Sequence, residues 1–162
     1  MYQKKTAYLG VFAAVAIIFG YVESLFPFFA GIPGIKLGLA NLAVLYILEK
    51  YTWKEAALVS AVRIVVIGFL FGNMFSILYS LAGAALSLAV MTLMKKRSGF
   101  SILGVSVSGG VSHNIGQLIV AALIVENAAF LYYAPVLIIS GVITGLLIGL
   151  LTREVAKRIP DL

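Results

Sequence analysis

The stretch SHNIGQL, residues 112–118, places polar side chains and the only histidine of the chain inside a long apolar run. Asn114 lies about 100° around a helix from His113, within reach of a neighbouring helix or a cavity edge. Hydrogen bonding between helices, at about 0.6 to 2 kcal/mol per bond, explains any one of these residues as well as ligand contact does. Their clustering beside glycines favours a lined cavity. On one helix face, i, i+3, i+4, i+7 spacing forms a small and polar stripe of Ser106, Gly109, Gly110, His113, Gly116 and Gln117.

Two other kinds of chemistry fit this stretch poorly. One histidine without cysteine or a neighbouring acid supplies too few ligands for a metal, so we expect no metal site, and we also predict no cofactor. Ser112 directly precedes His113, and adjacent helical residues point in different directions, so the two do not form a hydrolytic pair. The chain is therefore predicted not to be an enzyme.

Three charged residues, Glu23, Lys36 and Arg63, lie near or within apolar segments and need partners. Two interpretations of Arg63 stay open. In one, the side chain snorkels or forms an ion pair, with Glu23 as the partner, and fixes its helix in the bundle. In the other, the guanidinium binds an anionic ligand. Both roles are compatible, and the three charges are expected to converge on a pocket that opens outward.

The composition indicates an integral membrane protein, because 62% of the residues are hydrophobic, 11% are charged and the mean hydropathy is +1.11. So few charges leave most of the surface to lipid. Residues 1–162 are predicted to form one transmembrane domain. The net charge of +6 does not indicate nucleic-acid binding, because the basic residues form short clusters between apolar runs rather than one stripe.

The elements that must position the polar residues are six predicted transmembrane helices in a compact all-α bundle. The second has about 12 residues and rises only about 18 Å, so it needs extra turns, a thinned membrane or shelter by protein. The apolar segments are Thr6–Phe26, Leu37–Leu48, Ala56–Phe71, Met74–Leu93, Ile102–Val125 and Tyr132–Leu151.

The basic clusters orient this bundle. They all fall on one side of it, which is cytoplasmic by the positive-inside rule. Both termini are then cytoplasmic, and the chain is expected in the cell membrane as a multi-pass protein. The residues concerned are Lys4, Lys5, Lys50, Lys54, Lys95, Lys96, Arg97, Arg153, Lys157 and Arg158.

Small residues at four-residue spacing indicate close helix packing. Gly141, Gly145 and Gly149 form such a ridge in the last helix. In the first helix, Gly10, Ala13 and Ala14 form a small surface that is a candidate for docking a partner helix.

Several longer motifs resemble one known family, heptaprenyl diphosphate synthase component I, also called the Gx transporter family. The resemblance covers nearly the whole chain. Prenyl elongation requires aspartate-rich magnesium sites, and the only aspartate here is Asp161, so this chain cannot perform that chemistry alone. The motifs are YVESLFPF, IPGIKLGLANL, GNMFSILYSLAGAALSLAVM, GVSVSGGVSHNIGQLIVAALI and YYAPVLIISGVITGLLIGLL.

This family is similar in turn to the substrate-binding S-components of energy-coupling factor (ECF) transporters. That similarity implies six helices, an outward-facing pocket, and small residues of the first helix that contact a transmembrane coupling subunit bound to cytoplasmic ATPases. The chain has no G-x-x-x-x-G-K-[ST] phosphate loop, so partners must supply ATP hydrolysis. With aromatics of LFPFF and LYY as lid or stacking surface, the predicted ligand-binding residues are Glu23, Lys36, Asn41, Arg63, Asn73, Tyr79, His113, Asn114 and Gln117.

Two functions therefore compete. The first is a transport subunit that binds a small vitamin-like or flavin-like molecule, with a planar ring stacked on aromatics and an anionic or carbonyl group held by Arg63 and Lys36. The second is an accessory membrane subunit that serves isoprenoid or quinone precursor metabolism beside a prenyl diphosphate synthase. The bound molecule distinguishes the two.

Overall fold

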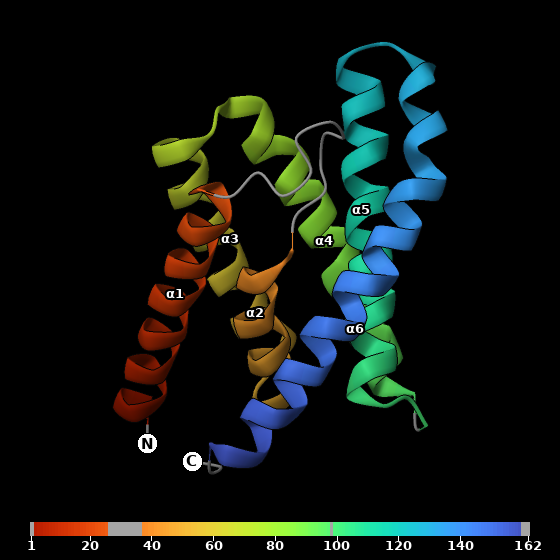
Figure 1. Ribbon diagram of the computed structural model, residues 1–162. Helices are drawn as coiled ribbons and strands as arrows, with labels where there is room; N and C mark the ends of the chain where they lie inside the picture. The colour runs from red at the N-terminus through yellow and green to blue at the C-terminus, as the bar shows by residue number, and fades with distance from the viewer. Residues whose placement is uncertain (1, 26–36, 98, 160–162) are drawn as a thin grey trace.

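A computed structural model describes residues 2–25, 37–97 and 99–159, and within these residues the regular elements are all helical (Figure 1). This confirms the predicted all-α class. The elements are α1 (Tyr2–Leu25), α2 (Leu39–Lys50), α3 (Trp53–Phe71), α4 (Met74–Lys96), α5 (Ile102–Ile124), the 3-10 helix η1 (Ala128–Tyr133) and α6 (Ala134–Arg158).

The six α-helices correspond to the six predicted apolar segments. α2 has 12 residues, and seven of them are buried, so protein shelters the short helix as one of the expected solutions. The sequence did not indicate η1, and α6 runs one and a half to two turns past the predicted Leu151. That extension is amphipathic and charged, which a search for apolar runs does not detect.

Four helical segments are long and apolar enough to cross a membrane, which supports a membrane protein. α2 is too short for this, and the 19 residues of α3 include Lys54, Glu55 and Arg63. Six spans therefore remain a prediction for these two helices. The four segments are Lys5–Leu25, Met74–Lys96, Ile102–Ile124 and Ala128–Arg158.

The helices form two groups of three. α1, α2 and α3 contact one another, while α5 packs against both α4 and α6 (Figure 1). Contacts of α3 with α4 and of α2 with α6 join the groups, and η1 lies against α5 and α6. The start of α1 and the end of α6 lie at the same end of the molecule. The candidate site lies between these two groups of helices.

The glycine ridge of α6 packs as predicted. A Cβ atom on Gly145 would lie 2.7 Å from the Val107 Cα, and one on Gly141 would lie 2.9 Å from the Val111 Cα. The Ser106 hydroxyl donates a hydrogen bond to the Gly145 carbonyl at 2.7 Å. The backbones of α5 and α6 therefore touch along this ridge, which only glycine permits.

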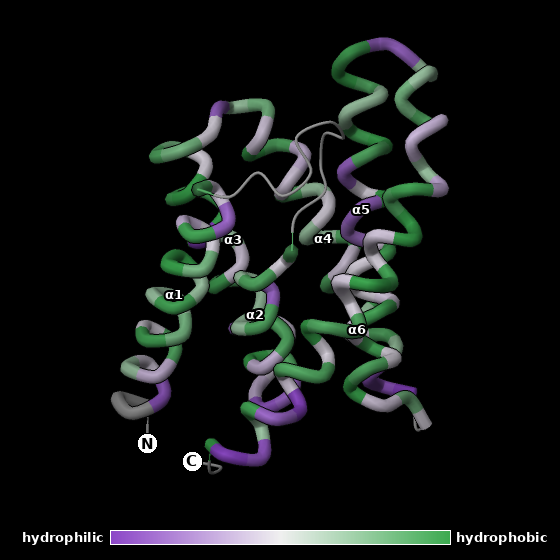
Figure 2. The backbone as a smooth tube through the Cα atoms, viewed as in Figure 1, coloured by the Kyte–Doolittle hydropathy of each residue, from purple (hydrophilic) through white to green (hydrophobic). Residues whose placement is uncertain are grey.

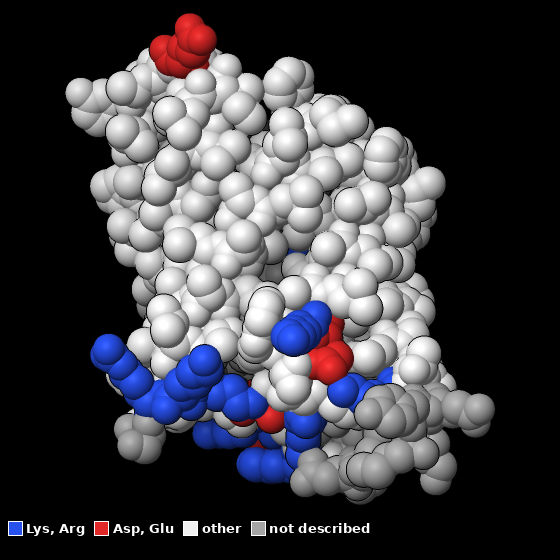
Figure 3. Space-filling view, turned by 180° about the vertical axis from the view of Figure 1, so that it is seen from behind, with Lys and Arg blue, Asp and Glu red and all other residues white. Residues whose placement is uncertain are grey.

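Charge is distributed unevenly along the molecule. Figure 2 shows hydrophobic residues along most of the helices, with hydrophilic residues at the helix ends and midway along α5. Most Lys and Arg side chains gather at one end of the molecule, with acidic atoms among them, and a further acidic group stands at the opposite end (Figure 3). We call the first the basic end, defined by Lys5, Lys50, Lys54, Lys95, Lys96, Arg97, Arg153, Lys157 and Arg158.

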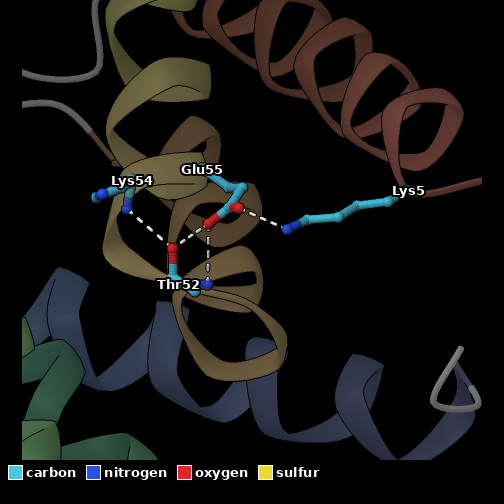
Figure 4. Close-up of polar contacts among 4 residues, drawn as sticks. All are labelled: Lys5, Thr52, Lys54 and Glu55. Atoms are coloured by element: carbon cyan, nitrogen blue, oxygen red, sulfur yellow. Dashed lines mark hydrogen bonds and ion pairs between the residues drawn. The ribbon is translucent and has the colours of Figure 1, made fainter. Parts of the chain in front are cut away.

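An ion pair at the basic end ties α1 to α3. Lys5 Nζ donates to Glu55 Oε1 at 2.5 Å, and Thr52 and Glu55 form a reciprocal capping box that starts α3 (Figure 4). The Lys5 and Thr52 hydrogen bonds lower the pKa of Glu55 from its ordinary 4.5 to about 2. Glu55 precedes the predicted span Ala56–Phe71 and so lies outside the membrane.

The Lys5–Glu55 ion pair predicts that the free energy of unfolding depends on pH. Because the pKa of Glu55 is lower in the folded chain, its contribution is fully present above about pH 4.5 and is lost as the pH falls toward 2. Glu55→Gln should lower the free energy of unfolding at neutral pH by about 0.5 to 1 kcal/mol, since the pair is partly exposed. Thermal unfolding in detergent at stepwise pH measures this difference, which should shrink below pH 4.5. Glu126→Gln, at the opposite end, should match wild type; equal curves for Glu55→Gln would contradict the prediction.

Candidate ligand-binding cavity

A cavity of about 400 Å³ lies between the two helix groups. All six α-helices contribute to its wall, which includes the second half of α3, the first turns of α4 and the middle of α5. It therefore occupies the part of the molecule away from the basic end. The lining residues are Gly20, Glu23, Ser24, Gly38, Asn41, Arg63, Ile64, Ile67, Gly68, Phe71, Gly72, Asn73, Ser76, Tyr79, Ser80, Gly110, His113, Asn114, Gln117 and Thr144.

The structure brings eight of the nine predicted ligand-binding residues to this one cavity. Lys36 lies outside the described residues. The predicted residues around the cavity are Glu23, Asn41, Arg63, Asn73, Tyr79, His113, Asn114 and Gln117.

Glu23 links α1 to the start of α2. Its Oε1 accepts a hydrogen bond from the Leu39 backbone N–H at 3.0 Å, so a carboxylate satisfies a free donor at the positive end of the α2 dipole. Gly38 precedes the helix with φ 75°, a left-handed conformation that favours glycine. The start of α2 therefore needs Gly38 for its backbone conformation and Glu23 as the acceptor for the Leu39 N–H. Glu23 also lies at the cavity wall.

Arg63 faces the cavity from the middle of α3. Its Nη2 donates to Asn41 Oδ1 at 3.0 Å, and no ion pair within 4 Å joins it to Glu23 among the described residues. The Glu23–Arg63 ion pair, part of one of the two interpretations left open for Arg63, is therefore not a direct contact, although Glu23 still attracts the guanidinium electrostatically while its Oε1 caps α2. The buried Nε of Arg63 has no hydrogen-bond partner in the described part of the chain. A cation with a free donor is thus held at the wall by a neutral amide.

Asn114 and Gln117 differ in the two roles that the sequence left open, hydrogen bonding between helices and lining of a cavity. Asn114 Nδ2 donates to the Leu137 carbonyl of α6 at 2.8 Å, so Asn114 joins two helices as well as lining the cavity. Gln117 is only 6% exposed, yet its amide makes no hydrogen bond with any described residue. A Cβ on Gly83 would meet Gln117 Cγ at 2.6 Å, so this glycine leaves the space that Gln117 fills.

Asn73 serves first as a cap. Its Oδ1 accepts from the Ser76 N–H at 2.8 Å, and the Ser76 hydroxyl accepts from the Asn73 N–H at 3.0 Å. This reciprocal box starts α4 directly after the tight turn at Gly72. The side chain is therefore already occupied, although it borders the cavity.

The cavity also has lining residues that sequence reasoning missed. Ile64, Gly68 and Phe71 share one face of α3 at helical spacing, a signal that was present but was hidden by the uniform hydropathy of the helix. Thr144 of α6 gave no signal, and its hydroxyl bonds its own helix at Ser140 O, 2.9 Å away. The other missed residues are Gly20, Ser24, Gly38, Ile67, Gly72, Ser76, Ser80 and Gly110.

The aromatic lid was only partly located. Phe26–Phe29 of LFPFF lie outside the described residues, whereas LYY is in η1, where Tyr132 is 87% exposed. Among the described residues, Phe71 and Tyr79 place aromatic side chains at the cavity wall. Phe71 packs against Tyr21 with ring centroids 4.9 Å apart.

The proposed docking surface of α1 is partly exposed. Gly10 and Ala14 are exposed, and a Cβ on Gly10 would meet nothing within 4 Å. Ala13 is half-buried and packs against the hydrophobic core.

A comparison with protein families finds one match, over residues 12–155, to heptaprenyl diphosphate synthase component I. Neither the curated proteins nor the solved structures contain a significant match to the chain.

Proposed function

The chain belongs to the heptaprenyl diphosphate synthase component I family, and we propose that it is a membrane-embedded substrate-binding subunit of the ECF S-component type. In this proposal, the cavity captures one small vitamin-like or flavin-like molecule that carries an anionic or carbonyl group. The chain performs no chemistry on that molecule. It holds the substrate until a transport partner acts.

The observation that carries this proposal is Arg63. Arg63 lines the cavity, and no ion pair within 4 Å neutralises its guanidinium among the described residues, so a ligand oxygen that bonds the guanidinium would supply the missing anion. The cavity volume of about 400 Å³ falls in the range of about 300 to 1,000 Å³ for small-molecule sites.

Two further features support a planar polar substrate. Phe71 and Tyr79 offer aromatic faces at the wall, and aromatic pairs contribute about 0.5 to 1.5 kcal/mol beyond burial. His113 and Gln117 add hydrogen-bonding groups from α5, in the helix group opposite to Phe71 of α3 and on the same side as Tyr79 of α4. A ring that stacks on one group and bonds the other would bridge the two halves of the bundle.

The transport cycle in this proposal depends on partners. A transmembrane coupling subunit would dock on Gly10, Ala13 and Ala14 of α1, and cytoplasmic ATPases would bind that subunit. The open surface at Gly10 and Ala14 leaves room for a close helix contact.

The family name favours a second candidate, an accessory membrane subunit of a prenyl diphosphate synthase. In that role the same cavity would hold a lipophilic diphosphate or a quinone precursor, and the partner would be the catalytic component. The described residues contain no cluster of three or more metal-binding side chains, and the sequence has one aspartate, so elongation chemistry would belong to that partner.

The experiment is to purify the chain in mild detergent and identify the bound small molecule by absorbance and mass spectrometry, in parallel with Arg63→Gln. A vitamin or flavin retained by wild type and lost from the variant supports the transport subunit. A prenyl compound supports the second candidate. Equal retention of the same molecule by both proteins contradicts the role of Arg63.

The proposed orientation has its own test. The positive-inside rule places the basic end in the cytoplasm, so a single cysteine at Lys96 should react with an impermeant maleimide only after the cells are opened. A cysteine at Ala128, at the start of η1, should react in intact cells. The cysteine-free chain provides a clean background. The reverse pattern of labelling would reverse the orientation and close the pocket to the outside.

A further inference from the structure

A second, smaller space adjoins the cavity. It measures about 90 Å³, and we call it the side chamber. Three residues of the main cavity, Tyr79, Asn114 and Gln117, also line the side chamber and so form a wall common to both. Its remaining lining residues, from α5, η1 and α6, are Leu118, Ala121, Phe130, Tyr133 and Leu137.

The two spaces differ in chemistry. The main cavity has charged, amide and hydroxyl side chains among its apolar residues, whereas the far side of the side chamber is aliphatic and aromatic. Leu118 and Leu137 are 7% and 4% exposed, whereas Tyr133 is 42% exposed, so the packed bundle forms the inner part of this apolar wall and η1 forms a more open side. An apolar chamber of this kind attracts an apolar group, because burial removes that group from water.

Gln117 is the part of the common wall whose amide no hydrogen bond to a described residue holds in place. It is more than nine-tenths buried, and its amide has no hydrogen-bond partner among the described residues. Rotation of this side chain therefore breaks no hydrogen bond. Asn114, in contrast, is fixed by its bond to Leu137 O. A ligand that passes between the spaces would displace Gln117 and give its amide the missing partner.

We propose that the substrate has two parts: a compact anionic head at Arg63 and a short apolar arm that enters the side chamber past Gln117. This inference rests on the proposed function and specifies its substrate class as a small amphipathic anion. The chamber is smaller than the engineered cavity of about 150 Å³ that binds benzene, so it takes only a short arm of a few carbon atoms.

Two matched pairs of probes test the proposal on the full chain in detergent. The first pair is methyl phosphate and 3-methylbutyl phosphate, and the second is acetate and 4-methylpentanoate. Isothermal titration should show that the branched member of at least one pair binds about tenfold or more tightly than the short member, because each buried methylene contributes about fourfold.

Ala121→Phe should remove this preference by filling the chamber, while the affinity for the short probe stays unchanged. Ala121→Leu is the milder version, should the larger side chain prevent folding. Ile119→Phe is the matched control, since Ile119 is on the same helix, is 46% exposed and lines neither space. It should retain the full preference.

The outcomes distinguish failure of the side-chamber proposal from failure of the proposed function. Equal affinity within both pairs, or a preference that survives filling of the chamber, overturns the side-chamber proposal. If the short probes still bind and lose affinity in Arg63→Gln, the proposed function stands without it. Failure of every probe to bind, or binding that does not depend on Arg63, overturns both.

Discussion

Gly145→Leu is expected to destabilise the fold more than any other change considered, by about 3 kcal/mol or more. A Cβ at this position would lie 2.7 Å from the Val107 Cα and 3.0 Å from the Ser106 carbonyl oxygen. Both are backbone atoms of α5, so no side-chain rotation relieves the overlap. The two helices must separate, and overpacking of this kind costs about 1 to 3 kcal/mol before other losses.

Separation of the helices also breaks contacts along the ridge. The hydrogen bond from Ser106 Oγ to the Gly145 carbonyl is 2.7 Å long and buried, and its loss adds about 1 kcal/mol. The backbone contacts of Gly141 and Gly149 with α5 lie one turn to either side. Since α5 also carries His113, Asn114 and Gln117, movement of α5 would displace one wall of the cavity.

Thermal unfolding in detergent measures this effect on purified variants. Gly145→Ala should lower the melting temperature less than Gly145→Leu, because one carbon requires a smaller separation. Gly10→Leu is the matched control: it adds the same side chain to a helical glycine with open space around it, and it should not destabilise. A melting temperature for Gly145→Leu equal to that of wild type would show that the two helices do not pack along this ridge.

The sequence predicted the packing of α5 against α6 well because the spacing of the glycines determines which helix face they occupy. Gly141, Gly145 and Gly149 repeat every four residues, so they must lie on one face, and a face without side chains has few uses other than close approach. The same reasoning placed the polar stripe of α5 inside the bundle. Helical periodicity alone was sufficient for both results.

To predict which polar groups pair, one must know their relative heights along the helix axes. Helical periodicity gives the face that a residue occupies but not these heights. An ion pair between Glu23 and Arg63 was one of two open interpretations, because both residues are charged and lie in or near apolar segments. In the structure, the free N–H of Leu39 takes the carboxylate, and Asn41 takes the guanidinium. Asn73 lines the cavity as predicted, but its Oδ1 also caps α4, a use that the sequence analysis did not assign to it. A polar side chain can cap a helix end or bind another side chain or a ligand, and the sequence does not show which of these contacts forms.

The side chamber was not predictable for a different reason. Its wall includes Phe130 and Tyr133 of η1, a six-residue 3-10 helix that has no periodic signal in the sequence. The apolar residues Leu118, Ala121 and Leu137 that complete it look like ordinary lipid-facing or core positions. Only their joint arrangement around an unfilled space distinguishes them.

Arg63→Gln separates a structural arginine from a binding arginine by the sign of its effect on stability. If Arg63 binds the substrate, the variant should lose about 1.5 to 3 kcal/mol of binding free energy, a roughly 10- to 100-fold weaker affinity for the co-purifying molecule. Its ligand-free melting temperature should stay equal to that of wild type or rise. Gln keeps a donor for Asn41, and it removes a cation whose buried Nε has no partner among the described residues.

Ligand titration and ligand-free thermal unfolding on the same preparation provide the two readouts. Arg153→Gln is the matched control, because Arg153 lies at the basic end with its side chain 46% exposed and is remote from the cavity wall. It should change neither quantity, since exposed ion pairs contribute little. A lower melting temperature together with an unchanged affinity for Arg63→Gln would make Arg63 a helix-packing residue, and the anionic head of the substrate would then need another partner in the cavity.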